Sequence, residues 1–460
     1  MDTPMMQSFI AKIVDLTNFF WGWPILILLM GGGLWIMYQL RFVQFRYLGT
    51  IMKETFGRMM NSNVDGGTGT VSPFQAASTA LASSIGAANI VVAPAIIFMA
   101  GPGAVFWMWV AGIIGCSTKF AEVALSIKYR ETNADGDYVG GASYTFKNGI
   151  GGVLGKIMGW LVAFFFMLEI LPSITLQTLS AVGPIEKLGL NTWVSVAVIF
   201  VLVSLVVFGG VRRIGQVTER MVPFMAGLYI IFGLIIIVMH ASKIPGALIS
   251  IFQGAFNPQS VAGGIAGATL AKAMQKGIAR GCYSNEAGMG SAGYGHAAAV
   301  TDHPARQGMW GIFEVVADTL IVCTISALVV LVTDVWKDPA NANVAIHQAF
   351  TGAFGTFGGV LVSVCLFLFV LSTIIVIVFY AEKQAEYCFG TTVGKIIRVI
   401  ASLMILLGAF ISFDNAGVFL DFTLGLVVFV NMLGMVMMSG KVRAIVDDFF
   451  GNPKYFPDKK

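Results

Sequence analysis

Apolar residues run along this chain in long continuous stretches, which short polar segments separate. The apolar residues do not alternate with polar ones, and many stretches reach the length of about 20 residues that a membrane-spanning helix needs. The pattern therefore predicts helices rather than barrel strands. We place eleven spans near residues 23–40, 74–100, 104–126, 157–180, 192–208, 221–240, 261–283, 308–333, 356–380, 396–413 and 417–438.

Composition supports this class of protein. Of the 460 residues, 57% are hydrophobic and 11% are charged, and the mean hydropathy is +0.82. Soluble proteins carry about 25% charged residues, so a polytopic all-α membrane protein is expected. The longest polar segments, 41–73 and 127–156, are too short for a soluble domain, so residues 1–460 form a single membrane domain. The five cysteines have no disulfide or metal-ligand spacing.

The positions of the basic residues predict the orientation. If the N-terminus lies outside, most of the 28 Lys and Arg residues fall in the segments on the cytoplasmic side. This bias is the positive-inside rule for inner-membrane proteins. We therefore expect a multi-pass plasma (inner) membrane protein with its N-terminus outside and a cytoplasmic tail at 439–460.

Two spans differ from ordinary lipid-soluble helices. The span at 74–100 contains 82-ASSIGAAN-89, and the span at 261–283 contains 262-AGGIAGATLAKAMQKGIARG-281. Glycine and small polar residues weaken a helix and let it unwind where it lines a cavity. For each span alone, close helix packing through small residues is an equally good interpretation.

The matching positions of these two spans favour interrupted helices. One opens a block of five spans at 74–240, and the other opens a second block of five at 261–438. Paired interrupted helices indicate an inverted-repeat transporter. We expect a leading helix at 23–40, then a five-plus-five repeat whose first and sixth helices are discontinuous and meet near Gly86 and Gly277.

At these spans the chain resembles the alanine or glycine:cation symporter family. The similarity is carried by 73-PFQAASTALASSIGAANI-90, 101-GPGAVFWMW-109, 118-TKFAEVALSIKYR-130 and, above all, 280-RGCYSNEAGMGSAGYGHAAAVTDHPARQ-307. The resemblance extends over the whole chain. It implies the inverted-repeat fold of the bacterial leucine transporter and transport of small amino acids on a sodium or proton gradient.

The resemblance also implies a sodium site between the first and eighth repeat helices. By position, its ligands are the carbonyls of Ala82, Ile85 and Phe369 and the hydroxyls of Ser372 and Thr373. Oxygen ligands of this kind suit a hard cation. From spacing alone, hydrogen bonds to carbonyls one turn earlier in their own helix explain the two hydroxyls better than an ion site does.

An amino-acid substrate needs partners for both of its charges. The turn at Ser84, Ile85 and Gly86 can offer N–H groups to its carboxylate. Candidates for the ammonium group and the rest of the pocket are Asn89, Gln177, Thr178, Gln275 and Gly277. For Gln177, an interhelical hydrogen bond is the alternative.

Ionisable residues inside spans are candidates for coupling or gating. Glu314 and Asp318 lie four residues apart on one helix face, and we expect one of them to pair with Lys272 or Lys276. We interpret Lys119 and Glu122 as a structural ion pair. Glu286 follows Ser284 and Asn285, which favour a helix N-cap, and the three residues suggest a cytoplasmic gate.

These observations predict a secondary symporter that moves alanine or glycine into the cell with sodium by alternating access. Nucleotide and zinc-hydrolase motifs are missing from the sequence, so we expect no enzyme activity, no organic cofactor, no nucleic acid or nucleotide partner and no obligate protein partner. Two alternatives stay open: a proton-coupled carrier of another small amino acid, and a transporter-like receptor without net transport. The second rests on 86-GAAN-89, which departs from the family pattern.

Overall fold

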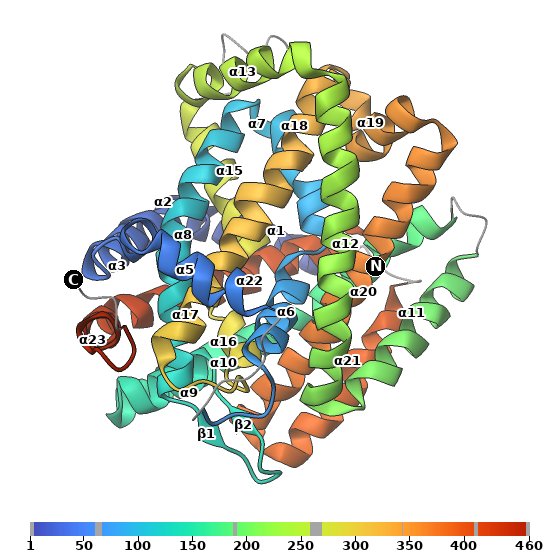
Figure 1. Ribbon diagram of the computed structural model, residues 1–460. Coiled ribbons are helices and arrows are strands. Elements are labelled where there is room, and N and C mark those ends of the chain that lie inside the picture. The colour runs from blue at the N-terminus through green and yellow to red at the C-terminus, as the bar shows by residue number, and fades with distance from the viewer. Residues whose placement is uncertain are drawn as a thin grey trace.

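The computed structural model of the chain describes residues 4–59, 67–186, 191–257, 269–342, 344–408 and 413–456. Helices form almost all of this structure and pack into one bundle (Figure 1). A short antiparallel hairpin joins β1 (Glu131–Thr132) to β2 (Tyr138–Val139), with Glu131 opposite Val139. These helices confirm the predicted class, a mainly helical polytopic membrane protein.

The first long apolar helical stretch starts before the predicted span at 23–40. Residues Ala11–Gln39 form one apolar helical stretch of 29 residues, which contains a π-helical segment. Its middle is fixed to α22 (Phe413–Met437) because Trp21 Nε1 donates to the carbonyl of Asp421 at 2.8 Å. The elements in this region are α1 (Pro4–Phe20), α2 (Trp23–Leu26), η1 (Ile27–Gly32), α3 (Gly33–Gln39), α4 (Val43–Arg46), α5 (Leu48–Glu54) and η2 (Phe56–Arg58).

The region predicted as the first repeat starts with an interrupted helix. Ser72 caps α6 by accepting from the Gln75 backbone, while the Gln75 side chain accepts from the Ser72 backbone. The helix ends at Ser84 and resumes after a short turn. The helices are α6 (Pro73–Ser84), η3 (Ala88–Val92), α7 (Ala93–Ala100), α8 (Gly103–Lys128), α9 (Ala142–Gly149), α10 (Gly152–Glu186), α11 (Thr192–Val207) and α12 (Gly210–Met239).

The second interruption lies outside the expected position. Helix α15 is continuous through Gly277, so the predicted break there is wrong, and the helix ends instead at Asn285. Residues 262–268 of the glycine-rich stretch lie outside the described residues. The helices that follow are α15 (Leu270–Asn285), α16 (Ala292–His296), α17 (Pro304–Val315), η5 (Val316–Cys323), α18 (Thr324–Val332), α20 (Thr356–Phe389), α21 (Thr391–Leu407) and α22 (Phe413–Met437).

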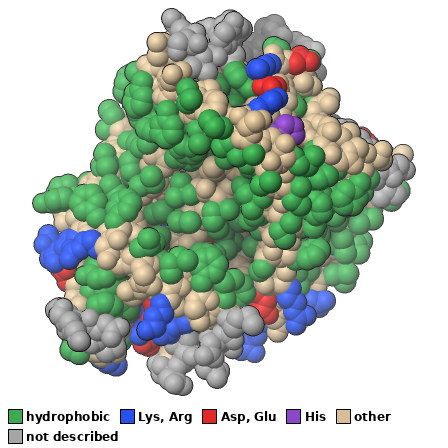
Figure 2. Space-filling view, turned by 45° about the horizontal axis from the view of Figure 1, so that its top comes forward, with side chains coloured by type: hydrophobic (Ala, Val, Ile, Leu, Met, Phe, Trp, Pro, Cys, Tyr) green, Lys and Arg blue, Asp and Glu red, His purple; other side chains and the backbone are tan. Residues whose placement is uncertain are grey.

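Seven helical stretches in the described ranges are both long and apolar enough to cross a membrane. They are Ala11–Gln39, Gly103–Lys128, Gly152–Val182, Gly210–Met239, Pro304–Val332, Thr356–Phe389 and Phe419–Met437. Figure 2 shows hydrophobic side chains spread over the middle of the visible face, with charged side chains gathered towards its ends. The count of eleven spans and the orientation of the termini stay predictions.

Several segments outside the predicted spans contain short helices. They include α13, which lies across the top of the bundle in Figure 1, and α23, which forms in the segment predicted as the cytoplasmic tail. Stacking of Tyr47 on Phe450, with ring centroids 3.6 Å apart, joins α23 to the segment before α5. The bounds are η4 (Ala241–Lys243), α13 (Ile244–Phe256), η6 (Val335–Lys337), η7 (Pro339–Asn341), α19 (Ala345–Phe354) and α23 (Ser439–Gly451).

Candidate functional site

The first interruption is a tight turn after α6. Ile85 has φ −78° and ψ 85°, which takes the backbone out of the helix. The N–H of Gly86 then donates to the carbonyl of Ser84 and to Oδ1 of Asn89, each at 2.9 Å. A Cβ atom on Gly86 would lie 2.7 Å from Oγ1 of Thr373, so glycine is needed because α20 approaches closely. The turn falls where the sequence predicted it.

Oxygen atoms from α6 and α20 converge beside this turn. Oγ1 of Thr373 lies 3.0 Å from the carbonyl oxygen of Ala82 and 2.9 Å from that of Phe369. Oγ of Ser372 lies 2.9 Å from the same Phe369 carbonyl oxygen. Both hydroxyls make the hydrogen bonds within their own helix that the alternative interpretation expects, but the contact with Ala82 crosses between helices. Four of the five predicted sodium ligands are therefore adjacent, and the fifth, Ile85, lies in the turn itself.

Gln177 on α10 faces the same turn. Its Nε2 atom is 3.7 Å from the position of a Cβ atom on Gly86. Its Oε1 atom is buried and has no hydrogen-bond partner within the described part of the chain. A buried amide oxygen without a donor is available to a cationic group. Thr178 differs, because its hydroxyl donates to the carbonyl of Ile174 at 2.8 Å.

Asp318 joins the two interrupted helices. Its carboxylate accepts from Nδ2 of Asn89 at 2.6 Å and from Oγ of Ser284, at the end of α15, at 3.0 Å. Thr319 donates to the same carboxylate at 2.7 Å. Asp318 is fully buried and lies in the π-helical segment η5. The arrangement ties both turns to one acidic side chain.

The second interruption covers residues 286–291 and is built from unusual backbone conformations. Glu286 has φ +57°, and Gly288 and Gly290 have φ +100° and +75°, which glycine adopts without a steric cost. Ser284 and Asn285 close α15 rather than open a helix, so their predicted N-cap role is wrong. The long motif 280–307 thus contains the break that we expected at Gly277.

Glu122 on α8 fixes this second turn. Its Oε1 atom accepts from the N–H groups of Gly288 and Gly290, both at 3.0 Å, and from Nδ2 of Asn431 at 2.7 Å. The predicted Lys119–Glu122 ion pair is replaced by this cap. Sequence reasoning missed the role of Glu122, although the glycine spacing of SNEAGMG signals exposed N–H groups that need an acceptor.

Lys119 lies at the centre of the buried charges. Its Nζ atom donates to the carbonyl of Asn285 at 2.8 Å and lies 3.8 Å from Oε2 of Glu314. Glu314 also contacts Nε2 of His296. We expected Lys272 or Lys276 to pair with Glu314 or Asp318, but the neighbouring lysine is Lys119.

Glu286 connects the two turns directly. Its carboxylate accepts from Oγ of Ser83, in the last turn of α6, at 3.1 Å, and also from Ser291. The residue is 8% exposed. Glu286 therefore links the last turn of α6 to the second interruption, and its role as a gate stays a prediction.

Two predicted substrate residues lie elsewhere. Nε2 of Gln275 donates to the carbonyl of Trp21 at 2.9 Å, which joins α15 to the leading segment. A Cβ atom on Gly277 would lie 2.3 Å from the carbonyl oxygen of Ala104 in α8, so this glycine serves close helix packing. The structure does not bring either residue to the turn at Gly86.

Comparison with known proteins agrees with this architecture. An uncharacterized transporter of Bacillus subtilis, YflA, is 43% identical over 98% of this chain and 96% of its own length. The sodium/alanine symporter AgcS of Methanococcus maripaludis is 34% identical over 95% of this chain and 96% of its own. The solved structure of MhsT in complex with L-phenylalanine has a TM-score of 0.56 at 14% identity, covering 83% of this chain and 99% of that one.

The structural likeness confirms the leucine-transporter fold, and the relatives confirm the resemblance noted in the sequence. The family model described as the sodium:alanine symporter family matches residues 5–459. Together with two interrupted helices that meet at buried polar residues, these matches show that the chain belongs to the sodium:alanine symporter family.

Proposed function

We propose that this protein imports a small neutral amino acid, alanine or glycine, together with sodium by alternating access. The observation that carries the proposal is the convergence of Ala82, Phe369, Ser372 and Thr373 oxygens beside an interrupted helix. Carbonyl and hydroxyl oxygens are ligands that a hard cation prefers. The ion site then lies next to the turn that would hold the substrate, so one ligand can stabilise the site of the other.

The substrate site that we propose is the turn Ser84–Ile85–Gly86 together with Asn89 and Gln177. Oε1 of Gln177 has no hydrogen-bond partner among the described residues, so it can accept from the substrate ammonium group. The substrate carboxylate would accept hydrogen bonds from N–H groups of the turn. The N–H of Gly86 now donates to Oδ1 of Asn89, so the carboxylate would replace that oxygen as the acceptor. Thr178, one residue further along α10, has no direct role in our proposal, because its side chain lies against Gly408 at the end of α21.

Proton coupling is a second candidate because of the buried charges. Glu122, Glu286, Glu314 and Asp318 are all less than 9% exposed, while the basic side chains of Lys119 and His296 both lie against Glu314. Burying an unpaired carboxylate is costly, so some of these groups need a proton or a cation. Transport that follows a proton gradient in the absence of sodium would favour this candidate.

Counterflow in proteoliposomes tests the main proposal. Vesicles loaded with unlabelled alanine are placed in labelled alanine at a fixed membrane potential, with sodium or choline on both sides. We expect accumulation of label with sodium, and little with choline, in the presence of a proton uncoupler. Equal accumulation in sodium and choline contradicts sodium coupling, and no counterflow for any small amino acid leaves the receptor alternative.

Replacing Gln177 by leucine should raise the half-saturating alanine concentration about ten- to a hundredfold. A hydrogen bond to a charged group contributes about 1.5–3 kcal/mol, and 1.4 kcal/mol corresponds to a factor of ten. The matched control is Gln275→Leu, which removes an amide of equal size that bonds to Trp21. Equal effects of the two variants on alanine uptake would place Gln177 outside the substrate site.

A further inference from the structure

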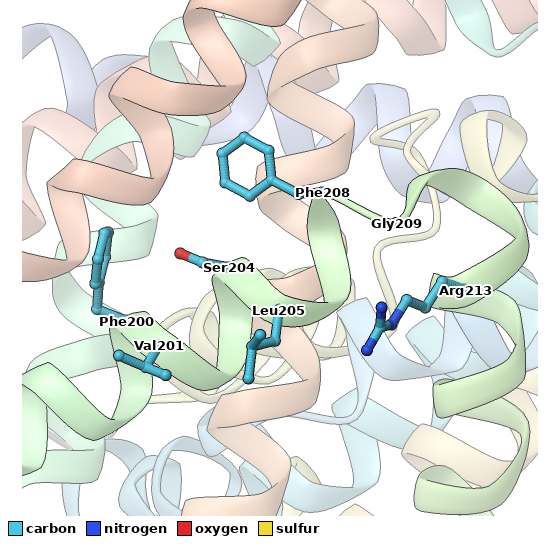
Figure 3. Close-up of a pocket in the computed structure, with 7 residues that line it drawn as sticks. All are labelled: Phe200, Val201, Ser204, Leu205, Phe208, Gly209 and Arg213. Atoms are coloured by element: carbon cyan, nitrogen blue, oxygen red, sulfur yellow. The ribbon is translucent and has the colours of Figure 1, made fainter.

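An open groove lies on the outer surface where α11 turns into α12. It has a volume of about 440 Å³ and is lined by Phe200, Val201, Ser204, Leu205, Phe208, Gly209 and Arg213 (Figure 3). Val201 and Leu205 in the apolar helix α11, and Phe208 directly after it, are more than half exposed. In a membrane these side chains face acyl chains, so the groove has the surroundings of a lipid site.

Arg213 reaches the groove because residue 209 has no side chain. A Cβ atom on Gly209 would lie 2.2 Å from Cδ and 2.8 Å from Cβ of Arg213. The backbone of Gly209 has φ −83° and ψ 0°, a conformation open to any residue. The glycine therefore provides space rather than backbone freedom, and the space holds the arginine side chain (Figure 3).

A second cation adjoins the same end of the groove. The guanidinium of Arg398, on α21, lies 5.0 Å from the ring centroid of Phe208. Its Nη1 atom is 3.4 Å from Oε2 of Glu382, but its buried Nε atom has no hydrogen-bond partner in the described ranges. Phe208 thus stands between an apolar surface and positive charge.

Ser204 adds a polar atom inside the groove. Its Oγ atom is buried and makes no hydrogen bond to any described residue. Buried hydroxyl groups normally have a partner, so an unpaired one in a groove suggests an external acceptor. Ser204 lies one helical turn before Phe208, between the apolar wall and the arginine end of the groove.

We propose that this groove binds one anionic phospholipid of the bilayer. An acyl chain lies along Phe200, Val201 and Leu205, the ester region reaches Ser204, and the phosphate is held by Arg213. Basic groups at the end of a membrane helix attract anionic headgroups, and arginine binds phosphate oxygens in a fork. The proposal concerns the surface of the protein and does not depend on which ion drives transport.

Native mass spectrometry of the purified protein in phosphatidylglycerol or phosphatidylcholine tests the proposal. We expect one phosphatidylglycerol to remain bound at collision energies that remove phosphatidylcholine. Arg213→Gln should lower the retained fraction about fivefold, since one basic residue near a membrane surface contributes that order of attraction. The control is Arg220→Gln, which removes the same charge from an exposed position on the same helix outside the groove.

Gly209→Ala provides a second variant that keeps every charge. Its methyl group would displace the Arg213 side chain, so it should lose the lipid as Arg213→Gln does. Adding inorganic phosphate or glycerophosphate should not displace the lipid from the wild-type protein, because neither fills the apolar part. Equal retention by Arg213→Gln and Arg220→Gln, equal retention of both lipids, or displacement by free phosphate would each overturn the proposal.

Discussion

Replacing Thr373 by valine is expected to lower the affinity for sodium ten- to a hundredfold. Valine keeps the shape of threonine and removes only Oγ1, the atom that lies within 3.0 Å of both the Ala82 and Phe369 carbonyl oxygens. The loss of one oxygen ligand to a charged partner amounts to about 1.5–3 kcal/mol. The measurement is the sodium-induced rise in the unfolding temperature of the purified protein, with choline as reference, because a ligand that binds the native state stabilises it.

The control for this experiment is Thr423→Val. Thr423 is buried, and its hydroxyl bonds back to the Phe419 carbonyl at 3.0 Å in its own helix, α22. It therefore matches Thr373 in chemistry but does not approach α6. A sodium response that is unchanged in Thr373→Val, or reduced equally in both variants, would contradict the ion site. The double variant Ser372→Ala, Thr373→Ala should abolish the response.

The first half of the site could be predicted because its signals are local. Glycine and small polar residues in mid-span at 82–89 indicate a break, and the structure places the turn at Ile85 and Gly86. The partner residues Ser372 and Thr373 came from the resemblance to a known family. Their meeting with Ala82 depends on a contact between positions 291 residues apart, which no local pattern determines.

The second break was misplaced because glycine has two uses in a membrane helix. Gly277 and Gly281 lie within α15, where they let α8 approach closely. Gly288 and Gly290 supply the positive φ angles of the true interruption. Both pairs look alike in sequence, and what separates them is the acceptor at Glu122, which belongs to a distant helix. Long-range hydrogen bonding decided the outcome, and composition alone could not show it.

The burial of the charged residues was predicted better than their partners, because the partners also depend on contacts between distant parts of the chain. The sequence indicated that Glu314 and Asp318 lie inside the membrane, and both are at most 1% exposed. Their partners come from α8, α15, α16 and η3, which the predicted span boundaries could not place relative to one another. Asp318 proved to be held by neutral donors from Asn89, Ser284 and Thr319 rather than by the expected lysine.

Replacing Glu122 by alanine should destabilise the protein by about 3 kcal/mol or more and abolish transport. The change leaves the N–H groups of Gly288 and Gly290 and the amide of Asn431 without their shared acceptor. Each buried donor that loses its partner costs about 1–3 kcal/mol. Thermal unfolding of the purified protein measures the loss of stability, and Glu186→Ala, at an exposed position, is the control.

Glu122→Gln separates the two roles of this residue. Glutamine keeps one oxygen that can accept from the turn, and its amide nitrogen takes the place of Oε2, which has no partner among the described residues. If Glu122 only caps the turn, this variant should keep most of the stability and most of the transport. If its charge is needed when the two interrupted helices move, transport should fall while stability is kept. Wild-type stability in Glu122→Ala would show that the turn at 286–291 forms without its cap.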